Sequence, residues 1–481
     1  MAKPTYELLD QLLDKKLDRR TFFTRLAALG VATPAVLAYL QACSNGTVAN
    51  TPGGKVTLTP PGKLPAGEAS KRPLIFNAWD FKPDVVRQFM ATFDSAYNES
   101  VNFNVIPGDF TAVMLNKLLS KASLDFLYTQ DNAVKFFNGG WLQDLSGLVN
   151  ISDIQQQTLP VQWQVQNYNG AIMGLPYFNS AKGVVATNEL ALAKAGLTGQ
   201  YPKTHTELYQ QVRQLKKDGV AQYPLIPHWV PLDYGITQMW AGEAICRGDK
   251  MWADDLSATF DSSTAAAQVL EDWKGLYQDK VVPPASLTWQ DSDRLDAFGT
   301  GKYVYCVLNG YNIYDVNQPS QSAIAGHVMA IPYSSEPWGF LDYAFYSVAR
   351  KDGSNADQKR ALDRAAQLVE FMGFKDDKGN FSVAKAWMEQ AFLGTGYPAL
   401  WNDPEVITAL TKWMPDIKLK AVFQTHYDKA VAIGGWKAIW YPDFNAAARP
   451  LLAKAILGQE TVPNTIKALK DSWNSLQATY K

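Results

Sequence analysis

The chain has 481 residues, more than one hydrophobic core usually serves, so its length predicts two lobes. Its 45 Lys and Arg residues against 46 Asp and Glu residues give a formal net charge of -1, which argues against nucleic acid or an acidic membrane surface as a partner. The 3 Cys and 4 His residues show no metal-binding spacing, and the Gly-Thr-Gly-Lys run at residues 299–302 lacks the spacing of a phosphate loop. We therefore expect neither a metal nor a cofactor.

The first segment of the chain is predicted to be an export signal. Arg19 and Arg20 precede an apolar stretch at residues 26–40 that is short for a membrane span, a combination typical of signal peptides. The stretch ends in Leu-Gln-Ala-Cys at residues 40–43, which resembles a bacterial lipobox, and the paired arginines resemble a twin-arginine signal. The resemblance implies that Cys43 is lipidated and anchors the exported protein to a membrane surface without a span.

These patterns assign residues 1–42 to a cleaved signal peptide and residues 43–72 to the lipidated cysteine and a flexible tether. Residues 44–72 are rich in Ser, Asn, Gly, Thr and Pro, as tethers are. The twin-arginine pattern usually has Ser and Lys where this chain has Asp18 and Thr24, so the general secretory route stays open as well.

Strands and helices alternate in the region that follows the tether. Apolar and β-branched runs predict strands at residues 73–78, 101–107 and 124–128. Helical spacing of apolar residues predicts helices at residues 83–97 and 110–122. This alternation indicates a mainly parallel α/β sheet, and ligands collect at the carboxyl ends of strands in such sheets. Trp79 and Asp80, at the end of the first strand, are therefore candidates for ligand contact.

A further strand end is predicted within residues 290–311. The first half shows helical spacing, and Gly299 and Gly301 are expected to end that helix in a left-handed cap. Residues 303–308 are typical of a buried strand. The strand is followed by Asn309, Gly310 and Tyr311. An amide, a glycine that admits close backbone approach and an aromatic ring suit a polar ligand with flat apolar faces, although an ordinary helix–turn–strand unit is an equal alternative.

Several longer segments share their order and spacing with one protein family. They are LDFLYTQDNAVKFFNGGWLQDLS at 124–146, YNGAIMGLPY at 168–177, PKTHTEL at 202–208, DAFGTGK at 296–302 and GTGYPA at 394–399. Together they resemble the extracellular solute-binding proteins of bacterial ABC importers, and within these the maltose-binding-like carbohydrate group. The resemblance covers residues 73–480.

The resemblance implies the two-lobed, type II periplasmic-binding-protein fold, an α/β fold with a ligand cleft between two discontinuous lobes. Lobe 1 is expected at residues 73–178 plus 338–390, and lobe 2 at residues 179–337 plus 391–481. Hinge closure would capture the solute, and the closed form would dock on the ABC permease, whose ATPase must be a separate chain. The implied protein is a monomeric, extracytoplasmic, membrane-anchored binding protein and no enzyme.

A carbohydrate ligand presents hydroxyl groups at its rim and C–H groups on its faces, so its site combines aromatic rings with carboxylate and amide groups. Strand ends and positions in the resemblance give the expected ligand-binding residues. They are Trp79, Asp80, Tyr128, Asp131, Tyr177, Asn179, Trp229, Asp233, Asn309, Gly310, Tyr311, Gly339, Phe340, Trp436 and Trp440.

Two other functions stay open at this point. Polyamine-binding proteins share the implied fold and surround a cationic ligand with aromatic and acidic residues. A secreted glycosidase would need a pair of carboxylates, which Asp80, Asp131 and Asp233 could supply. The lipobox and the order of the segments favour a binding protein, and the maltose-like segments favour carbohydrate. Cys246 and Cys306 are expected as buried thiols, although an exported protein would also permit a disulfide between them.

Overall fold

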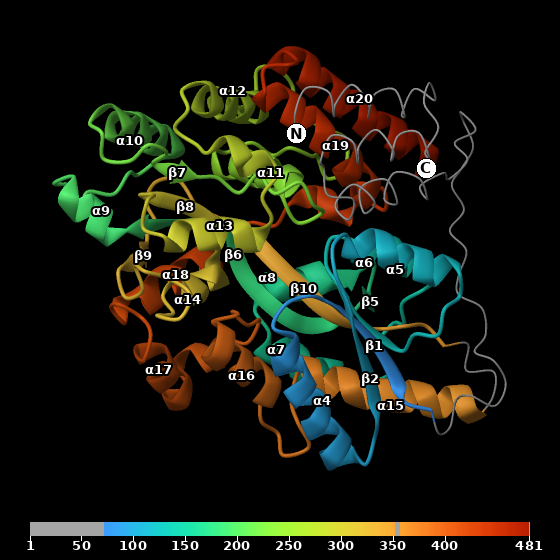
Figure 1. Ribbon diagram of the computed structural model, residues 1–481. Helices are drawn as coiled ribbons and strands as arrows, with labels where there is room; N and C mark the ends of the chain where they lie inside the picture. The colour runs from blue at the N-terminus through green and yellow to red at the C-terminus, as the bar shows by residue number, and fades with distance from the viewer. Residues whose placement is uncertain (1–71, 352–355, 481) are drawn as a thin grey trace, which may run out of the picture. The chain divides into compact units, whose positions relative to one another are not determined.

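The computed structural model describes residues 72–351 and 356–480, which belong to one compact unit of the chain (Figure 1). The predicted export signal with Arg19 and Arg20, and the predicted lipidation site Cys43, lie outside the described residues. Among the described helices, none combines the length and the apolar character of a membrane span.

One mixed sheet forms the centre of the described unit, with the strand order β2-β1-β3-β10-β6-β8-β7 and with β9 paired to β6. Its strands are β1 (Leu74–Trp79), β2 (Val101–Ile106), β3 (Phe126–Thr129), β6 (Leu175–Asn188), β7 (Leu225–Ile226), β8 (Tyr305–Asn309), β9 (Val328–Ala330) and β10 (Phe340–Val348). A separate hairpin joins β4 (Asn167–Tyr168) to β5 (Ala171–Ile172). The expected parallel pairing holds for β1 with β2 and β3. The sheet as a whole is mixed because β6 and β10 run antiparallel to their neighbours.

The helices begin and end close to the predicted positions where apolar spacing is regular. Up to β8 they are α4 (Pro83–Tyr97), α5 (Phe110–Leu119), α6 (Ala133–Asn138), α7 (Ile151–Gln157), α8 (Pro160–Gln166), α9 (Glu189–Lys194), α10 (His205–Lys217), α11 (Ile236–Cys246), α12 (Ala265–Gln278) and α13 (Asp291–Gly299). After β8 they are α14 (Ile313–Val316), α15 (Ala356–Gly373), α16 (Ser382–Ala391), α17 (Pro404–Thr411), α18 (Lys418–Lys429), α19 (Tyr441–Ile456) and α20 (Val462–Tyr480). Of the two glycines expected to end α13, Gly301 takes the left-handed conformation with φ +76°, whereas Gly299 is the last helical residue.

Alternate residues of β10 pack on opposite faces of the sheet, because successive side chains of a strand point in opposite directions. Tyr343 and Phe345 join an apolar cluster with residues of α11, α12, α19 and α20. Ala344 and Tyr346 join a second cluster with residues of α4, α15 and α16. Figure 1 shows the first set of helices at the top of the view and α4 and α15 at the bottom. The sheet is therefore covered on both faces.

Strand β6 lies between β10 and β8, so it joins the β2-β1-β3-β10 part of the sheet to the β8-β7 part. All of its 14 residues are buried, and it pairs with β10 along one part and with β8 and β9 along another. The register with β8 shifts between Lys182 and Val184, where Gly183 takes a φ of +90°. Such a bulge bends a strand locally. The bend lies between the part of β6 that pairs with β10 and the part that pairs with β8.

Both cysteines in the described part of the chain are free and buried. Burial raises the pKa of the Cys306 thiol to about 12, against the opposing charge of Arg294. The structure therefore contains the two expected buried thiols and no disulfide between them.

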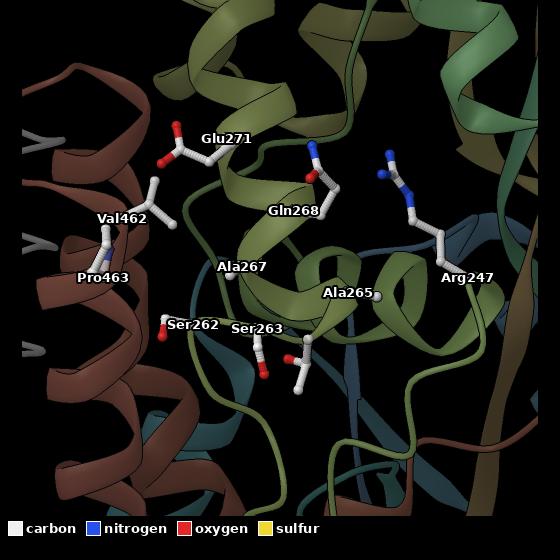
Figure 2. A pocket seen from close by; sticks show the side chains of 10 residues that line it. Arg247, Ser262, Ser263, Ala265, Ala267, Gln268, Glu271, Val462 and Pro463 are labelled. Atoms are coloured by element: carbon white, nitrogen blue, oxygen red, sulfur yellow. The ribbon is translucent and has the colours of Figure 1, made fainter.

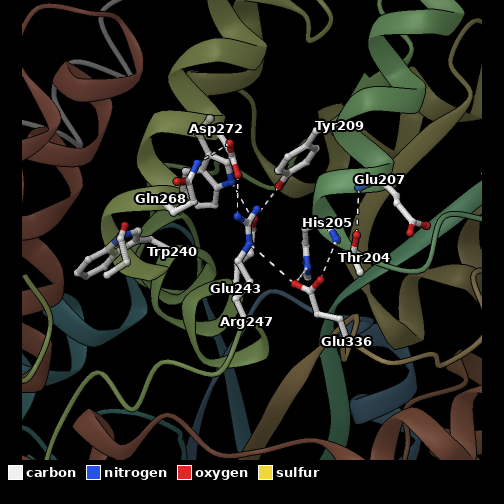
Figure 3. Close-up of polar contacts among 12 residues, drawn as sticks. Thr204, His205, Glu207, Tyr209, Trp240, Glu243, Arg247, Gln268, Asp272 and Glu336 are labelled. Carbon is white, nitrogen blue, oxygen red and sulfur yellow. Dashed lines mark hydrogen bonds and ion pairs between the residues drawn. The ribbon is translucent and has the colours of Figure 1, made fainter. Parts of the chain in front are cut away.

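The start of α10 has a side-chain cap (Figure 3). Thr204 Oγ1 accepts the Glu207 N–H at 3.1 Å, and Glu207 Oε2 accepts the Lys203 N–H at 2.7 Å. We expect Thr204→Ala to lower the free energy of unfolding by about 1 kcal/mol, because a backbone N–H at the helix start loses its acceptor. Urea denaturation of both proteins measures this difference.

Thr425→Ala is the matched control for this change. Thr425 is exposed within α18, and its hydroxyl donates to the Ala421 carbonyl at 2.9 Å. Alanine is a better helix former than threonine, so this variant should be at least as stable as the wild type. Equal losses in the two variants would contradict a capping role for Thr204.

Candidate ligand-binding site

A cavity of about 550 Å³ lies where the ends of several strands meet. It is lined by residues that end or follow β1, β2, β3 and β8, by the middle of β6, by Asp342 of β10 and by the start of α13. The carboxyl ends of β1, β2 and β3 open to one edge because these strands are parallel. The cavity is therefore at the position where open α/β sheets bind ligands.

Aromatic rings form part of the cavity wall. Trp79 lies 5.7 Å from Tyr177 between ring centroids, and Tyr128 supports both from beneath, at 4.7 Å from Trp79 and 4.4 Å from Tyr177. A second group joins Tyr311 to Phe81 at 5.3 Å and to Phe178 at 6.0 Å. Packing of this kind fixes the rings that line the cavity in place, so they can serve as rigid contact surfaces.

Carboxylates dominate the polar part of the lining. Asp131 Oδ2 accepts hydrogen bonds from Gln238 Nε2 at 3.2 Å and from Asn445 Nδ2 at 3.4 Å. Burial raises the pKa of Asp131 to about 7, and the negative charge of Asp233 adds to this shift. Asp342 accepts a hydrogen bond from Gln130 Nε2 at 2.7 Å, and burial raises its pKa as well.

The buried cation in this region is Lys182, whose Nζ donates to Gln238 Oε1 at 2.9 Å and lies 5.6 Å from the centroid of the Tyr234 ring. The side chain is 1% exposed, so its charge depends on the nearby carboxylates Asp131 and Asp342 for compensation. The lining thus offers hydrogen-bond acceptors, buried donors and ring faces to a polar ligand.

The structure places the predicted binding residues in two groups. Those that line the cavity are Trp79, Asp80, Asp131, Tyr177, Asp233 and Tyr311. Those that are buried and do not line it in this structure are Tyr128, Asn179, Trp229, Asn309, Gly310, Gly339, Phe340, Trp436 and Trp440. Ligand contact remains a prediction for both groups.

Packing explains the burial of the second group. Trp229 lies against Trp273 at 5.5 Å, Trp436 against Tyr343 at 4.7 Å, and Trp440 against Trp473 at 5.5 Å. Each large ring therefore fills the core of the face that α11, α12, α19 and α20 cover. Asn179, in the fully buried strand β6, donates a hydrogen bond from its Nδ2 to Gln162 Oε1 at 3.3 Å.

Asn309 and Gly310 support the cavity from behind. Asn309 Nδ2 donates to the Tyr311 hydroxyl at 2.9 Å and so fixes the ring that lines the cavity. A Cβ on Gly310 would lie 3.0 Å from the Tyr427 hydroxyl and 3.1 Å from the Ala181 carbonyl oxygen. The glycine thus permits close approach of the chain to β6 and α18.

Several residues of the lining were not predicted from the sequence. They are Phe81, Lys82, Gln130, Phe178, Lys182, Asp291, Asp315 and Asp342, among others. For Lys182 and Asp342 the sequence does hold a signal, since each is the one charged residue of its strand. Charged residues are rarely buried without a partner or a function.

Figure 2 shows a second hollow, of about 340 Å³, at the start of α12. Arg247 lines it, but this guanidinium is already bound to Glu243 and to Asp272, the latter at 2.6 Å (Figure 3). The N–H of Ala266 at the helix start is bonded to Asp249 at 3.1 Å. The charges around this hollow are therefore matched within the protein. No cluster of three or more His, Cys, Asp or Glu residues in the described ranges is arranged to hold a metal ion.

Comparison with solved structures shows the same architecture in other proteins. Maltose-bound MalE3 of T. maritima superposes with a TM-score of 0.69 at 18% identity, covering 84% of this chain and 99% of that one. A solute-binding protein of Agrobacterium radiobacter in complex with ribitol gives 0.70 at 15% identity, covering 85% and 99%. The GacH receptor of Streptomyces glaucescens, solved unliganded and with acarbose, gives 0.66 at 17% identity, covering 85% and 100%.

These similarities establish the two-lobed fold of periplasmic solute-binding proteins. No curated protein sequence matches this chain. The sequence does match a described family, the bacterial extracellular solute-binding proteins, over residues 88–378. The chain therefore belongs to the bacterial extracellular solute-binding protein family.

Proposed function

We propose that this protein is the substrate-binding component of an ABC importer and that it captures a sugar, a polyol or an oligosaccharide in the cavity at the strand ends. The observation that carries the proposal is the lining itself, where the rings of Trp79, Tyr177 and Tyr311 lie beside the carboxylates of Asp131 and Asp342. Structural relatives with bound maltose and ribitol support the same ligand class.

The lining matches the chemistry of a carbohydrate. Ring faces of Trp79 and Tyr177 would cover the C–H groups of a sugar, and Asp131 and Asp342 would accept hydrogen bonds from its hydroxyl groups. The cavity volume of about 550 Å³ lies within the range of roughly 300–1,000 Å³ that small-molecule sites occupy. An analogue lacking one hydroxyl would leave a buried acceptor unpaired and bind less well.

The proposal includes the route of the protein to the cell surface. Arg19 and Arg20 support export, and the Leu-Gln-Ala-Cys run supports lipidation of Cys43. The anchored monomer would deliver its solute to permease subunits with a separate ATPase, without catalysing a reaction. The proposed lobes, residues 73–178 plus 338–390 and residues 179–337 plus 391–481, are supported by the strands β6 and β10 that connect the two ends of the sheet.

A thermal-shift screen of the purified protein tests the proposal. The additives are maltose, maltotriose, ribitol, spermidine and free amino acids, because a ligand that binds the native state raises Tm by mass action. We expect Tm to rise with at least one carbohydrate and not with amino acids. Hydrolysis of an oligosaccharide during the assay would overturn the binding-protein proposal.

A cationic ligand such as a polyamine is the second candidate, favoured by the balance of charge in the lining. The acidic lining residues are Asp80, Asp131, Asp233, Asp291, Asp296, Asp315 and Asp342, against the basic residues Lys82 and Lys182. An ammonium group could bind between carboxylates and ring faces. A rise in Tm with spermidine alone would keep the fold and the transport role but replace the carbohydrate.

A further inference from the structure

Ion pairs in the described ranges link the segments after β1, β2 and β3 to helices α14 and α19. They are Lys82–Asp315 at 2.6 Å, Asp109–Arg449 at 3.4 Å and Lys135–Asp443 at 2.6 Å. The partners are 233, 340 and 308 residues apart in the chain. Each pair joins proposed lobe 1 to proposed lobe 2, so each would break if the lobes separated.

The Lys135–Asp443 pair lies outside the set of residues that line the cavity. The Lys135 side chain is 3% exposed, and its Nζ also lies 5.6 Å from the centroid of the Tyr480 ring. The Tyr480 hydroxyl in turn donates to Asp443 Oδ2 at 2.5 Å. A cation buried to this extent is stable only beside a counter-charge, whereas separated lobes would return it to water. Asp443 therefore stabilises the closed arrangement selectively.

The Lys82–Asp315 pair lies at the cavity itself, since both residues belong to its lining. The two side chains are 27% and 14% exposed, so solvent screens the pair less than it would a surface pair. Lys82 takes a left-handed backbone conformation with φ 44°, which is costly for a residue with a side chain. Such conformations persist where surrounding contacts hold them, and the ion pair is one of these contacts.

We propose that these ion pairs act as latches that stabilise the closed arrangement of the lobes and thereby set ligand affinity. Lys135 and Asp443 are positioning residues in this proposal, because they act on closure from outside the cavity. The effect on affinity rests on the proposed function, whereas the effect on closure does not.

Affinity follows closure because only the closed form surrounds a ligand from both sides. If the closed fraction falls to about a tenth, the apparent Kd rises about tenfold even though no ligand contact is lost. Asp443→Lys sets a second cation against the buried Lys135, so repulsion and desolvation both penalise the closed form. Separation of the lobes would let water solvate both charges.

Small-angle X-ray scattering of the full-length protein at low ionic strength, without added solute, tests the latch directly. We expect a larger radius of gyration for Asp443→Lys than for the wild type. The double variant with Lys135→Asp and Asp443→Lys restores an opposite-charge pair and should return the radius to the wild-type value. With maltose as the probe, the apparent Kd should rise about tenfold or more in the single variant and recover in the double variant.

Asp471→Lys is the matched control, because it makes the same charge change in the exposed Lys467–Asp471 pair within α20. Its radius of gyration should equal that of the wild type, and melting curves would show that every variant is folded. An equal radius for Asp443→Lys and the wild type would overturn the latch. A changed radius without any maltose binding would instead leave the latch standing and count against maltose as the ligand.

Discussion

Replacing Trp79 by alanine is expected to weaken carbohydrate binding by about a hundredfold. Trp79 lines the cavity, is partly exposed and is held by Tyr128 and Tyr177 beneath and beside it. Loss of a well-packed aromatic contact typically costs about 2–4 kcal/mol of binding free energy, and about 1.4 kcal/mol corresponds to a tenfold change in Kd. Isothermal titration with the carbohydrate that gives the largest thermal shift measures the change.

Trp163→Ala is the control for the Trp79 variant. Trp163 lies in α8, is also partly exposed and packs against the same apolar cluster, but it does not line the cavity. This variant should lose some stability and keep the wild-type Kd. If the folded Trp79→Ala protein bound carbohydrate as tightly as the wild type, the aromatic wall would not be the sugar-contacting surface.

Ligand affinity is expected to fall as the pH rises from about 4 to about 7. Burial raises the pKa of Asp131 to about 7, with a further contribution from Asp233, whereas an aspartate in water titrates near 3.9. At a pH between these two pKa values, Asp131 therefore takes up a proton when the lobes close. This protonation stabilises the closed form fully below about pH 4, and the stabilisation is lost as the pH approaches 7. For one proton the largest slope is about tenfold in affinity per pH unit.

The polar and charged groups around Asp131 influence its protonation and therefore the pH dependence of ligand affinity. Those that face Asp131 or its neighbour Asp233 are Gln238, Asn445, Lys182, Asp109, Arg449 and Thr111. Burial and the charge of Asp109 raise the pKa of Asp233 as well. Asp131→Asn should flatten the pH profile, while Asp80→Asn, at an exposed position of the lining, should keep the wild-type slope. A wild-type Kd constant from pH 4 to 7 would contradict proton-linked closure.

Local signals in the sequence were sufficient to predict the first helices and strands of the fold. The limits of α4 follow from Pro83 at its first position and from apolar residues at helical spacing, of which Val86, Phe89 and Phe93 are buried. The strand-end argument also placed Trp79 and Asp80 at the cavity, because strand direction and carboxyl ends can be inferred from the order of the elements.

Packing between residues that are distant in the chain could not be predicted from the sequence. Tyr128 and Trp79 are both aromatic residues at strand ends, yet Tyr128 is buried because Tyr177, distant in the chain, stacks on it. The same holds for Lys135 and Asp443, whose pairing depends on how α6 meets α19 after the whole sheet has formed. Local spacing does not predict which residues distant in the chain will pair. A charged residue within a buried strand, such as Lys182, does indicate a candidate ligand-binding site.

The shared strand β6 has a consequence for how the molecule folds. Since β6 pairs with β10 and β9 on one side and with β8 on the other, cutting the sheet at this strand would leave rows of unpaired backbone groups. Unpaired strand edges attract other chains and promote aggregation. Neither half of the molecule is thus an autonomous folding unit, and the chain completes its two lobes together or not at all.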